Sequence, residues 1–432
     1  MKTTIKTLCG LLAILAFTAC SSNTDEAVNA PQFWHVTLTA SMGDETTRAL
    51  SADGNTITAS FAENDEVKVL KSDGTLVGTL TVKTAGASTT LDGIISGTFS
   101  VNEELTCRYR SETANYDGQN GTLAGIATGQ DYAEGKLIVS ATDPLAFKSS
   151  HVSLAAKQSI TKFSFTCGGS PVSVKTFGIA ATGLVQSIAA DATSTETVGA
   201  VTGELDTALP NVYIALRNNS GIKQKYYFTI KDNAGNWYTG TKSAPLENGK
   251  NYTASVALTK LDALTSSSAV GTIGVVGGLP AIVVEFNSTK KAVALMNAGA
   301  LCPEDYGEYY TYENRASGLS NGWYVPTQDE LFVGANNNAT GGLAYISNAW
   351  TTQNGVKGRL FTISEGKTLF FPAAGYYENG NNLLAVSTDG YYWSSTEYDT
   401  NLAYYLDVDN SGAATYSEYQ VDRLSVRPFH AL

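Results

Sequence analysis

Apolar residues recur at every second position in short runs along residues 33–258, and turns rich in Gly, Asn and Asp separate these runs. Glu66–Leu70 and Leu76–Val82 alternate on either side of a Ser-Asp-Gly turn, which predicts a β-hairpin. Residues 226–230 and 237–239 flank a second turn and predict another hairpin. No segment of this region keeps a helical period over three turns, so we predict a mostly β fold built from sandwiches.

The charge balance excludes one class of partner. The chain has 432 residues, with 28 Lys and Arg against 40 Asp and Glu, which gives a formal net charge of −12. A chain this acidic repels phosphate backbones, so no nucleic-acid partner is expected. The length is sufficient for about three domains.

The first twenty residues have the pattern of a secretion signal. Lys2 and Lys6 precede a short apolar run, and small residues then lead to Cys20. The run is too short to span a bilayer, which takes about 20 apolar residues. Residues 17–20 resemble a bacterial lipobox. The resemblance implies a signal peptide at 1–19, acylation of Cys20 and a polar tether at 20–32. The alternative is an ordinary signal with a chance cysteine.

Two stretches, residues 33–144 and 145–260, share short motifs with one family of surface proteins. The first contains Thr46-Thr47-Arg48-Ala49 and later Asn64-Asp65-Glu66-Val67, and the second closes with Gly249-Lys250-Asn251-Tyr252-Thr253. Both resemble the fimbrillin-like family of type V pilus subunits and related surface lipoproteins. The resemblance implies two tandem Greek-key β-sandwiches on a protein anchored by lipid to the outer membrane at the cell surface.

Arg48 is a candidate processing site. In the fimbrillin-like family a protease cuts after an arginine of the first domain and removes the leading strand. The open groove then accepts a strand from the next pilin, which is donor-strand exchange. Here Val36, Leu38 and Ala40 alternate as a removable strand requires, and Arg48 follows in a polar stretch that a protease can reach. The alternative is an uncut surface arginine.

The composition changes after residue 260. Residues 261–275 are rich in Ser, Thr, Ala and Gly and contain no aromatic residue, which predicts a linker. Residues 276–432 hold 15 of the 23 tyrosines and three of the five tryptophans. This change predicts a separate C-terminal domain, which we call the head.

Ordered motifs in the head resemble a bacterial surface domain. Thr327 and Glu330 have the spacing of a capping box, so a helix is predicted to start there. Together with Ala373-Ala374-Gly375, Tyr392–Thr396 and Ser425–Phe429, this segment resembles the domain related to the Legionella collagen-like protein C-terminal domain. That resemblance implies an α+β, C-type-lectin-like fold for residues 276–432. We expect Trp393 to be a buried anchor and Arg427 to make an internal ion pair or carbonyl contacts.

One segment of the head has the spacing of a calcium-binding loop. Hard oxygen ligands at alternate positions, a glycine for the bend and a terminal carboxylate are what calcium requires. The candidate ligands are Asp407, Asp409, Ser411 and Glu418. The flanking residues look like strands rather than helices, so the alternative is a β-hairpin with a polar turn. No other cofactor is expected.

Tyrosines beside polar residues are the candidate ligand contacts of the head. Exposed rings can stack on sugars, and neighbouring carboxylates can accept hydrogen bonds from hydroxyl groups. The alternative is core and edge packing. The first group is Tyr306, Tyr309, Tyr310 and Tyr312, and the second is Tyr398, Asp399, Asn401, Tyr416 and Tyr419.

Catalysis is not expected. Cys9 would leave with the signal and Cys20 would carry the lipid, so Cys107, Cys167 and Cys302 remain, and they are too far apart to indicate a disulfide framework or a CxxC pair. The lectin-like frame also occurs in formylglycine-generating enzymes, but that chemistry relies on paired cysteines and the head has only Cys302. The three histidines lie in unrelated segments and suggest neither a zinc site nor a triad.

These observations predict a cell-surface lipoprotein adhesin, with the first choice a pilus tip subunit. The segment that ends in Val426-Arg427-Pro428 is expected to be folded into the head, so the chain can accept a strand but has none to donate. The head would contact a host protein or glycan. The alternative is a free-standing outer-membrane glycan-binding lipoprotein that never joins a pilus.

Overall fold

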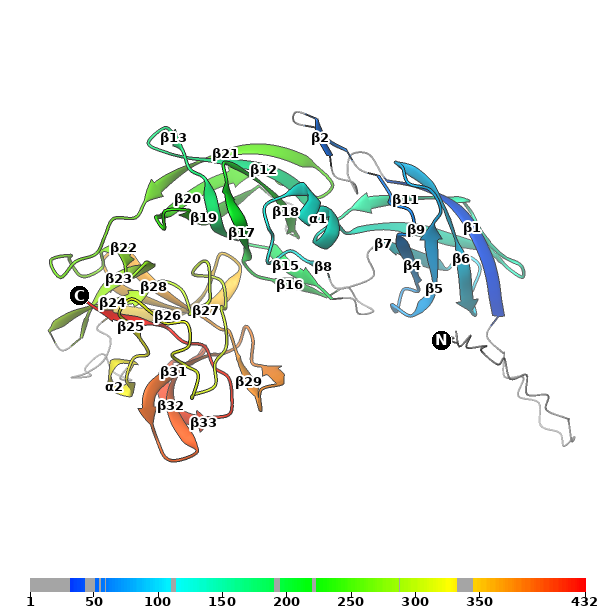
Figure 1. The fold of residues 1–432 in the computed structure, drawn as a ribbon. Coiled ribbons are helices and arrows are strands. Elements are labelled where there is room, and N and C mark those ends of the chain that lie inside the picture. Colours follow the sequence, from blue (N-terminus) through cyan, green and yellow to red (C-terminus); the bar gives the residue numbers. More distant parts are fainter. Residues whose placement is uncertain are drawn as a thin grey trace, which may run out of the picture.

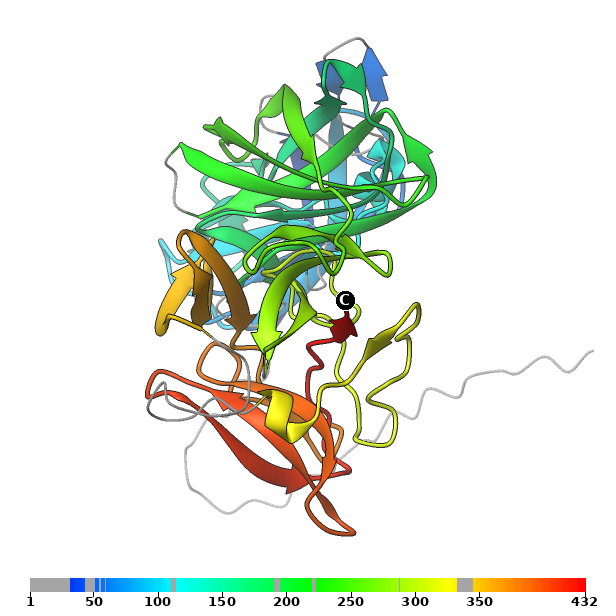
Figure 2. The same ribbon diagram turned by 90° about the vertical axis from the view of Figure 1, so that its left-hand side faces the viewer.

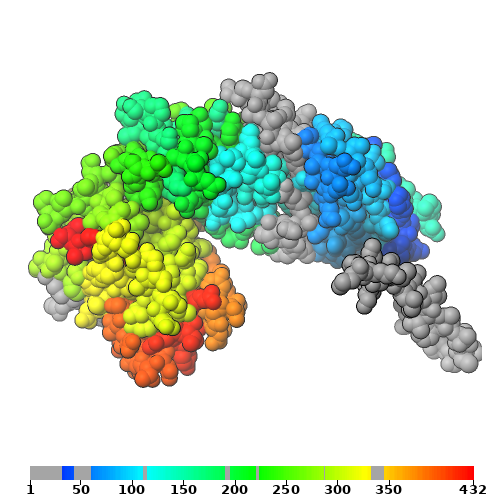
Figure 3. Space-filling model, viewed as in Figure 1, coloured from blue at the N-terminus to red at the C-terminus, as the bar shows by residue number. Residues whose placement is uncertain are grey.

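The computed structural model describes residues 32–42, 51–53, 56–58, 60–109, 114–189, 195–219, 223–286, 288–331 and 345–432. The mostly β prediction is confirmed, and the strands form three bodies, with the second domain lying between the first domain and the head (Figures 1 and 3). The predicted signal peptide, Cys20 and Arg48 lie outside the described residues. Neither helix in the described part of the chain is long and apolar enough to span a membrane.

The first domain is one closed sheet. Its strands are β1 (Gln32–Met42), β4 (Glu66–Leu70), β5 (Leu76–Val82), β6 (Ser88–Gly97), β7 (Glu104–Tyr109), β9 (Ala133–Thr142), β10 (Leu145–Phe147) and β11 (His151–Ala156). The order is β10-β9-β11-β1-β6-β5-β4-β7, and β7 also pairs with β9. The domain therefore has the hydrogen-bonded closure of a barrel, where the sequence predicted a Greek-key sandwich. A separate hairpin, β2 (Ser51–Asp53) and β3 (Thr56–Thr58), follows β1.

The second domain is an open sheet folded around its own core. It contains β12 (Ser159–Cys167), β13 (Ser170–Pro171), β14 (Val174–Ala180), β15 (Leu184–Ile188), β16 (Glu196–Val198), β17 (Val201–Leu209), β18 (Asn211–Asn218), β19 (Gln224–Asp232), β20 (Trp237–Ala244) and β21 (Asn251–Lys260). Strand β12 and the last strand, β21, pair in parallel over eight residue pairs, from Ile160–Asn251 to Cys167–Leu258. The predicted hairpins at β4–β5 and β19–β20 are both confirmed.

The boundary between the first and second domains differs from the one predicted at residues 144/145. The short strand β8 (Ala114–Asn115) pairs with β15, and helix α1 (Leu123–Gly129) packs on β18, so this segment belongs to the second domain. Strand β11 lies beyond the predicted boundary but pairs with β1 and β9 in the first domain. The chain therefore passes between the two domains three times.

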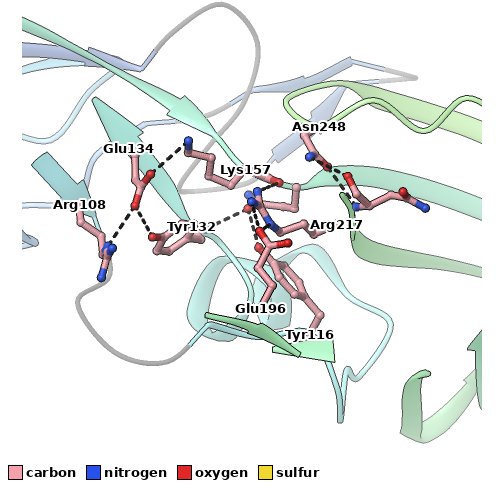
Figure 4. A network of polar contacts seen from close by, with 10 residues as sticks. Arg108, Tyr116, Tyr132, Glu134, Lys157, Glu196, Arg217 and Asn248 are labelled. Carbon is pink, nitrogen blue, oxygen red and sulfur yellow. Dashed lines mark hydrogen bonds and ion pairs between the residues drawn. The ribbon is translucent and has the colours of Figure 1, made fainter. Parts of the chain in front are cut away.

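A network of polar side chains fills the junction between the two domains (Figure 4). Glu134 accepts hydrogen bonds from Arg108 Nε, at 3.1 Å, and from the Tyr132 hydroxyl, and it forms an ion pair with Lys157 at 3.1 Å. On the other side, Arg217 pairs with Glu196 and donates to the Lys157 carbonyl at 2.7 Å. The network ties strands of the first sheet to strands of the second.

The head contains several small sheets. Strands β22 (Ile273–Val276), β23 (Leu279–Phe286), β24 (Thr289–Ala294), β34 (Phe429–Ala431) and β25 (Trp323–Tyr324) form one sheet in that order. A second sheet contains β26 (Ser347–Gln353), β27 (Val356–Ser364) and β28 (Lys367–Pro372), and β29 (Tyr376–Glu378) pairs with β30 (Asn382–Leu384). Strands β31 (Gly390–Glu397), β32 (Leu402–Val408) and β33 (Ala413–Tyr419) form the sheet farthest from the second domain (Figures 1 and 2).

The predicted linker at 261–275 is instead part of the head. Leu264 is buried among residues of β23 and β24, Ala263 bridges to Val275, and β22 begins at Ile273. Gly271 has φ +83° and lies so close to Ser364 that a Cβ atom would collide with that side chain. Small residues fit here because the chain packs closely, so composition alone gave a misleading prediction.

The predicted helix start is confirmed by a reciprocal capping box. The Glu330 amide donates to Thr327 Oγ1 at 3.3 Å, and the Thr327 amide donates to Glu330 Oε2 at 2.8 Å. Helix α2 (Gln328–Leu331) starts at this cap. The tail is also folded into the head as predicted, because β34 lies between β24 and β25.

Candidate functional site

Strand β1 occupies a slot in the first domain that its removal would open. It pairs with β6 over ten residue pairs and with β11 over four, so it separates these two strands. Val36, Leu38 and Ala40 point inward and are buried in the domain core, in agreement with the predicted alternation. Without β1, the hydrogen-bonding edges of β6 and β11 and an apolar groove would be exposed.

Polar side chains hold the outer face of β1 in register. Thr39 Oγ1 and Ser41 Oγ lie 3.1 and 2.9 Å from the two ring nitrogens of His151 on β11. On the β6 side, Thr37 donates to Asp92 at 2.8 Å, and His35 lies 3.2 Å from the same carboxylate. These contacts are specific to this register, because a slip of one residue would turn them into the core.

The first predicted group of tyrosines is mainly structural. Tyr310 and Tyr312 are buried, and their hydroxyls donate to Glu308 Oε2 and to the Ser395 carbonyl. Tyr309 donates to the Ala374 carbonyl at 2.5 Å, and Tyr306 lies 3.5 Å from Ser387 Oγ. The prediction of exposed rings is wrong for Tyr310 and Tyr312, because both rings pack into the core around Trp393.

The second predicted group is exposed but does not form one surface. Tyr398, Tyr416 and Tyr419 expose 56%, 55% and 59% of their surface. Asp399 accepts the amides of Asn401 and Leu402 and so builds the turn between β31 and β32. Tyr416 and Tyr419 are three residues apart on one strand and point to opposite faces of the sheet. Tyr398 packs against Tyr404, whereas Tyr416 packs against Tyr405 on the other face.

The predicted calcium ligands are not brought together. Asp409 Oδ1 accepts the amides of Ser411 and Gly412, at 2.8 and 2.7 Å, and the segment is the turn of the β32–β33 hairpin. Glu418 lies opposite Ala403, four residues from Asp407 along β32, which corresponds to roughly 13 Å. Within the described ranges, no group of three His, Cys, Asp or Glu side chains is placed to hold a metal. The hairpin alternative therefore describes this segment, and we propose no calcium site.

Comparison with protein families gives one match. Residues 348–429 match the family model of a domain of unknown function, DUF8237, which covers less than half of the chain. No curated protein matches the chain.

Solved structures give weak matches. A candidate cell adhesion protein from Bacteroides uniformis shares 14% identity with this chain at a TM-score of 0.31, over 52% of this chain and 96% of that one. A candidate cell adhesion protein from Bacteroides ovatus shares 12% identity at a TM-score of 0.30, over 54% and 97% of the two chains. A fimbrial assembly protein from Parabacteroides distasonis shares 12% identity at a TM-score of 0.28, over 59% and 96%.

The joint between the second domain and the head is closely packed. Cys302 lies against Gly178, where a Cβ atom would approach within 2.6 Å of the cysteine side chain, and Ala180 and Ala200 complete this contact. Trp237 of β20 donates its ring N–H to the Gly278 carbonyl of the head at 2.8 Å. Burial raises the pKa of the Cys302 thiol well above its ordinary value. This thiol is therefore not prepared as a nucleophile.

Two carboxylates lie at the same joint. Glu304 is buried and accepts hydrogen bonds from the side chains of Gln353 and Asn354 at 2.9 and 2.7 Å. Burial raises the pKa of Glu304. Burial also raises the pKa of Asp305, and the charge of Asp117 from the second domain adds to that effect. Both shifts mean that the folded joint binds protons more tightly than the unfolded chain does.

We expect the Glu304→Gln variant to gain stability relative to the parent chain as the pH rises. A group whose pKa is higher in the folded chain than in the unfolded chain stabilises the fold fully at pH values below its ordinary pKa. This contribution is lost as the pH rises through the pKa of the folded state. Glutamine does not titrate at position 304. The unfolding free energy of the variant minus that of the parent chain should therefore increase by about 1 kcal/mol between pH 4 and pH 8. Urea unfolding of both chains at the two pH values measures this. A difference that is independent of pH would contradict the expectation.

Proposed function

We propose that this chain is a lipid-anchored adhesin of the cell surface that joins a pilus as its tip subunit. Its first domain accepts a strand from a neighbouring pilin after cleavage at Arg48, and its head contacts a host protein or glycan. Before this cleavage, Cys20 carries the lipid that holds the uncut chain at the outer membrane, where an acyl chain contributes about 0.8 kcal/mol per buried methylene. Because Cys20 precedes Arg48, the cut removes the lipid together with β1.

The position of β1 is the observation that carries this proposal. The strand precedes Arg48 in the sequence and inserts Val36, Leu38 and Ala40 into the core. It is held between β6 and β11 by backbone pairing, so another extended segment with the same alternation can replace it. A strand at the margin of the domain would leave no such slot.

The fold of the head supports the tip position. Residues 390–408 and 413–419 form the β31–β33 sheet, and β34 is paired on both sides within the head. Their backbone groups are already hydrogen-bonded to other strands of the head. This segment is therefore not free to complete the slot of a neighbour.

Exposed aromatic rings at the far end of the head supply its contact surface. Tyr398 and Tyr419 are more than half exposed and lie on the side of the sheet away from the stacked tyrosines of β31 and β32. Such rings can stack on a sugar or cover an apolar protein surface. They serve the alternative role, a free-standing glycan-binding lipoprotein, equally well. An uncut chain that binds on a glycan array would favour that alternative.

A strand-uptake experiment tests the first role. The purified chain is cut after Arg48 by an arginine-specific protease, β1 is displaced in mild urea, and a fluorescein-labelled peptide with the sequence of residues 32–42 is added. We expect the cut chain to take up the peptide and to recover its thermal stability, measured by size-exclusion chromatography and melting.

Two controls make the result specific. A peptide with Leu38→Asp should not be taken up, because a charge would enter the core, and an Arg48→Ala chain should resist cleavage and exclude the peptide. If the cut chain fails to bind the peptide of residues 32–42 after β1 has been washed away, the acceptor role is wrong.

A further inference from the structure

Four tyrosine rings lie in a row on one face of the β31–β33 sheet, with one pair stacked and two pairs tilted. Tyr376 on β29 packs on Tyr391 with ring centroids 4.6 Å apart, and Tyr391 stacks on Tyr405 at 5.2 Å. Tyr416 continues the series at 6.3 Å from Tyr405 and is 55% exposed. The row therefore runs from β29 across three strands to the edge strand β33. We call it the tyrosine ladder.

Carboxylates share this face with the tyrosine ladder. Asp407 follows Tyr405 by two residues and lies opposite Tyr391 in the strand pairing, and Glu418 follows Tyr416 by two. Residues two apart on a strand point to the same side, so these groups face the same way as the rings. Asp389 lies next to β31 and acts on both Asp407 and Tyr391.

Among the described residues, Arg359 acts on Asp409, but no cation is seen to act on Asp407 or Glu418. The charged groups that act on Asp407 are Asp389 and Asp409, and those that act on Glu418 are Asp422 and Glu378, all of them carboxylates. Burial, together with the neighbouring carboxylates, raises the pKa of Asp407 to about 7. Holding negative charge at this position is therefore unfavourable in the free protein.

Asp407 lacks a partner on its covered side. Its Oδ1 atom is fully buried and has no hydrogen-bond partner in the described part of the chain, while the rest of the side chain is partly exposed. Asp409, two residues on, uses its carboxylate to hold the hairpin turn. Asp407 has no comparable structural task, so fold stability does not account for its presence here.

We propose that the face of the β31–β33 sheet that carries the tyrosine ladder binds a lysine or arginine side chain from an extended segment of a partner protein. This inference rests on the proposed role of the head as a contact domain. The cation would pair with the exposed oxygen of Asp407 and lie against the exposed ring of Tyr416, which attracts cations through its face. Tyr405 is buried and supports the ring of Tyr416 from the core side. The net charge of −12 would speed the approach of such a partner.

Charge complementarity favours this ligand over a neutral sugar. A glycan hydroxyl can accept or donate a hydrogen bond at Asp407, but it leaves the mutual repulsion of Asp389, Asp407 and Asp409 unchanged. An ammonium or guanidinium group removes that repulsion and uses the ring of Tyr416 as well. Tyr398 and Tyr419 lie outside the ladder and are not part of this site.

A peptide-binding experiment tests the proposal. The probe is a fluorescein-labelled peptide of alternating glycine and arginine. The control is the same peptide with citrulline in place of arginine, which keeps the shape of the side chain and removes its charge. Fluorescence anisotropy with the intact chain at pH 8 and low salt should show binding of the arginine peptide at least about tenfold tighter than that of the citrulline peptide.

Three variants locate the site. Asp407→Asn and Tyr416→Ala should each weaken binding of the arginine peptide by about fivefold or more. Glu365→Gln removes the same charge from the exposed β27–β28 turn of the head and should leave binding unchanged. Near-ultraviolet circular dichroism confirms that each variant is folded.

The outcomes separate this inference from the proposed function. Equal binding of the two peptides, no binding of either, or full binding by Asp407→Asn would overturn the cation site. If the arginine peptide binds in a way that depends on Asp407, but the cut chain does not take up the peptide of residues 32–42, the cation site stands and the pilus role is rejected. If the cut chain takes up the peptide of residues 32–42, but the arginine peptide does not bind through Asp407, only the cation site is rejected.

Discussion

Replacing Trp393 by alanine is expected to lower the unfolding free energy of the head by about 4 kcal/mol. Trp393 is completely buried, and its ring N–H donates to the Tyr310 carbonyl at 2.7 Å. The ring of Tyr312 packs edge-on against it at 5.5 Å. The substitution removes this packing, leaves a cavity and removes one of the two hydrogen bonds that the Tyr310 carbonyl accepts, the other coming from the Leu424 amide at 3.0 Å.

Regional hydrogen exchange measures this effect. In the variant, the amides of β31 and β32 should lose their protection from exchange at a lower urea concentration than in the parent chain. Trp393→Phe keeps most of the ring and loses the hydrogen bond, so a smaller loss of about 1–3 kcal/mol is expected. Trp350→Ala on β26 is the matched control, because Trp350 is only partly buried, and it should cost about 1 kcal/mol or less. Equal losses at the two tryptophans would show that Trp393 is not an anchor.

Replacing Glu134 by glutamine is expected to destabilise the junction of the first two domains by about 3 kcal/mol. Glu134 is the shared partner of Arg108, Tyr132 and Lys157 (Figure 4). The Arg108 side chain is only 6% exposed and would lose its ion pair with Glu134. Removing one partner of a buried ion pair is among the largest single penalties in a folded protein.

The chain offers a matched control for this prediction. Glu104 and Lys136 form an ion pair at 3.0 Å on the same two strands, but both side chains are about half exposed. Glu104→Gln should therefore change the unfolding free energy by less than about 1 kcal/mol. Thermal and urea unfolding of both variants tests the contrast, and equal effects would contradict it.

The effect of Glu134 should also depend on pH. Burial alone would raise its pKa, but the hydrogen bond from Tyr132 and the charges of Lys157 and Arg108 outweigh burial and hold the pKa below its ordinary value. A lowered folded-state pKa stabilises the fold above the ordinary pKa, and this contribution is lost as the pH falls through the folded pKa. The gap between the parent chain and Glu134→Gln should therefore narrow in acid. The stability contribution of Glu304 depends on pH in the opposite direction, because the pKa of Glu304 is raised in the folded chain.

Local patterns predicted local structure well. The β4–β5 and β19–β20 hairpins follow from alternation and turn residues, and the Thr327–Glu330 capping box follows from spacing. Trp393 is buried as its surroundings indicated. Arg427 makes carbonyl contacts, with Ala294 and Phe370, and burial lowers its pKa to about 10. Each of these features depends on residues close in sequence or on the burial of one side chain.

Pairings between distant segments could not be predicted in the same way. Closure of the first domain requires β7 to pair with β9, and the 114–131 segment crosses to the second domain between these two strands. Alternation says which residues share a face of one strand, but it does not say which strand lies alongside. The tyrosine ladder was missed for this reason, since Tyr391 meets Tyr405 only through the register of β31 with β32.

One error could have been avoided from the sequence. Tyr416 and Tyr419 are an odd number of residues apart in a segment expected to be a strand, so they had to point to opposite faces. The Tyr306–Tyr312 segment gave no such signal. It is not a regular strand in the structure, and the burial of Tyr310 and Tyr312 is set by contacts with β31 and with residues near 424.

The parallel pairing of β12 with β21 determines how the second domain would respond to a pull. The first domain leads into the start of β12, and the head continues from the end of β21, which lie at opposite ends of the paired segment. A pull applied between the start of β12 and the head would therefore slide the two strands along each other. All eight residue pairs would share that shearing force at once, instead of separating one by one as in a peeled hairpin.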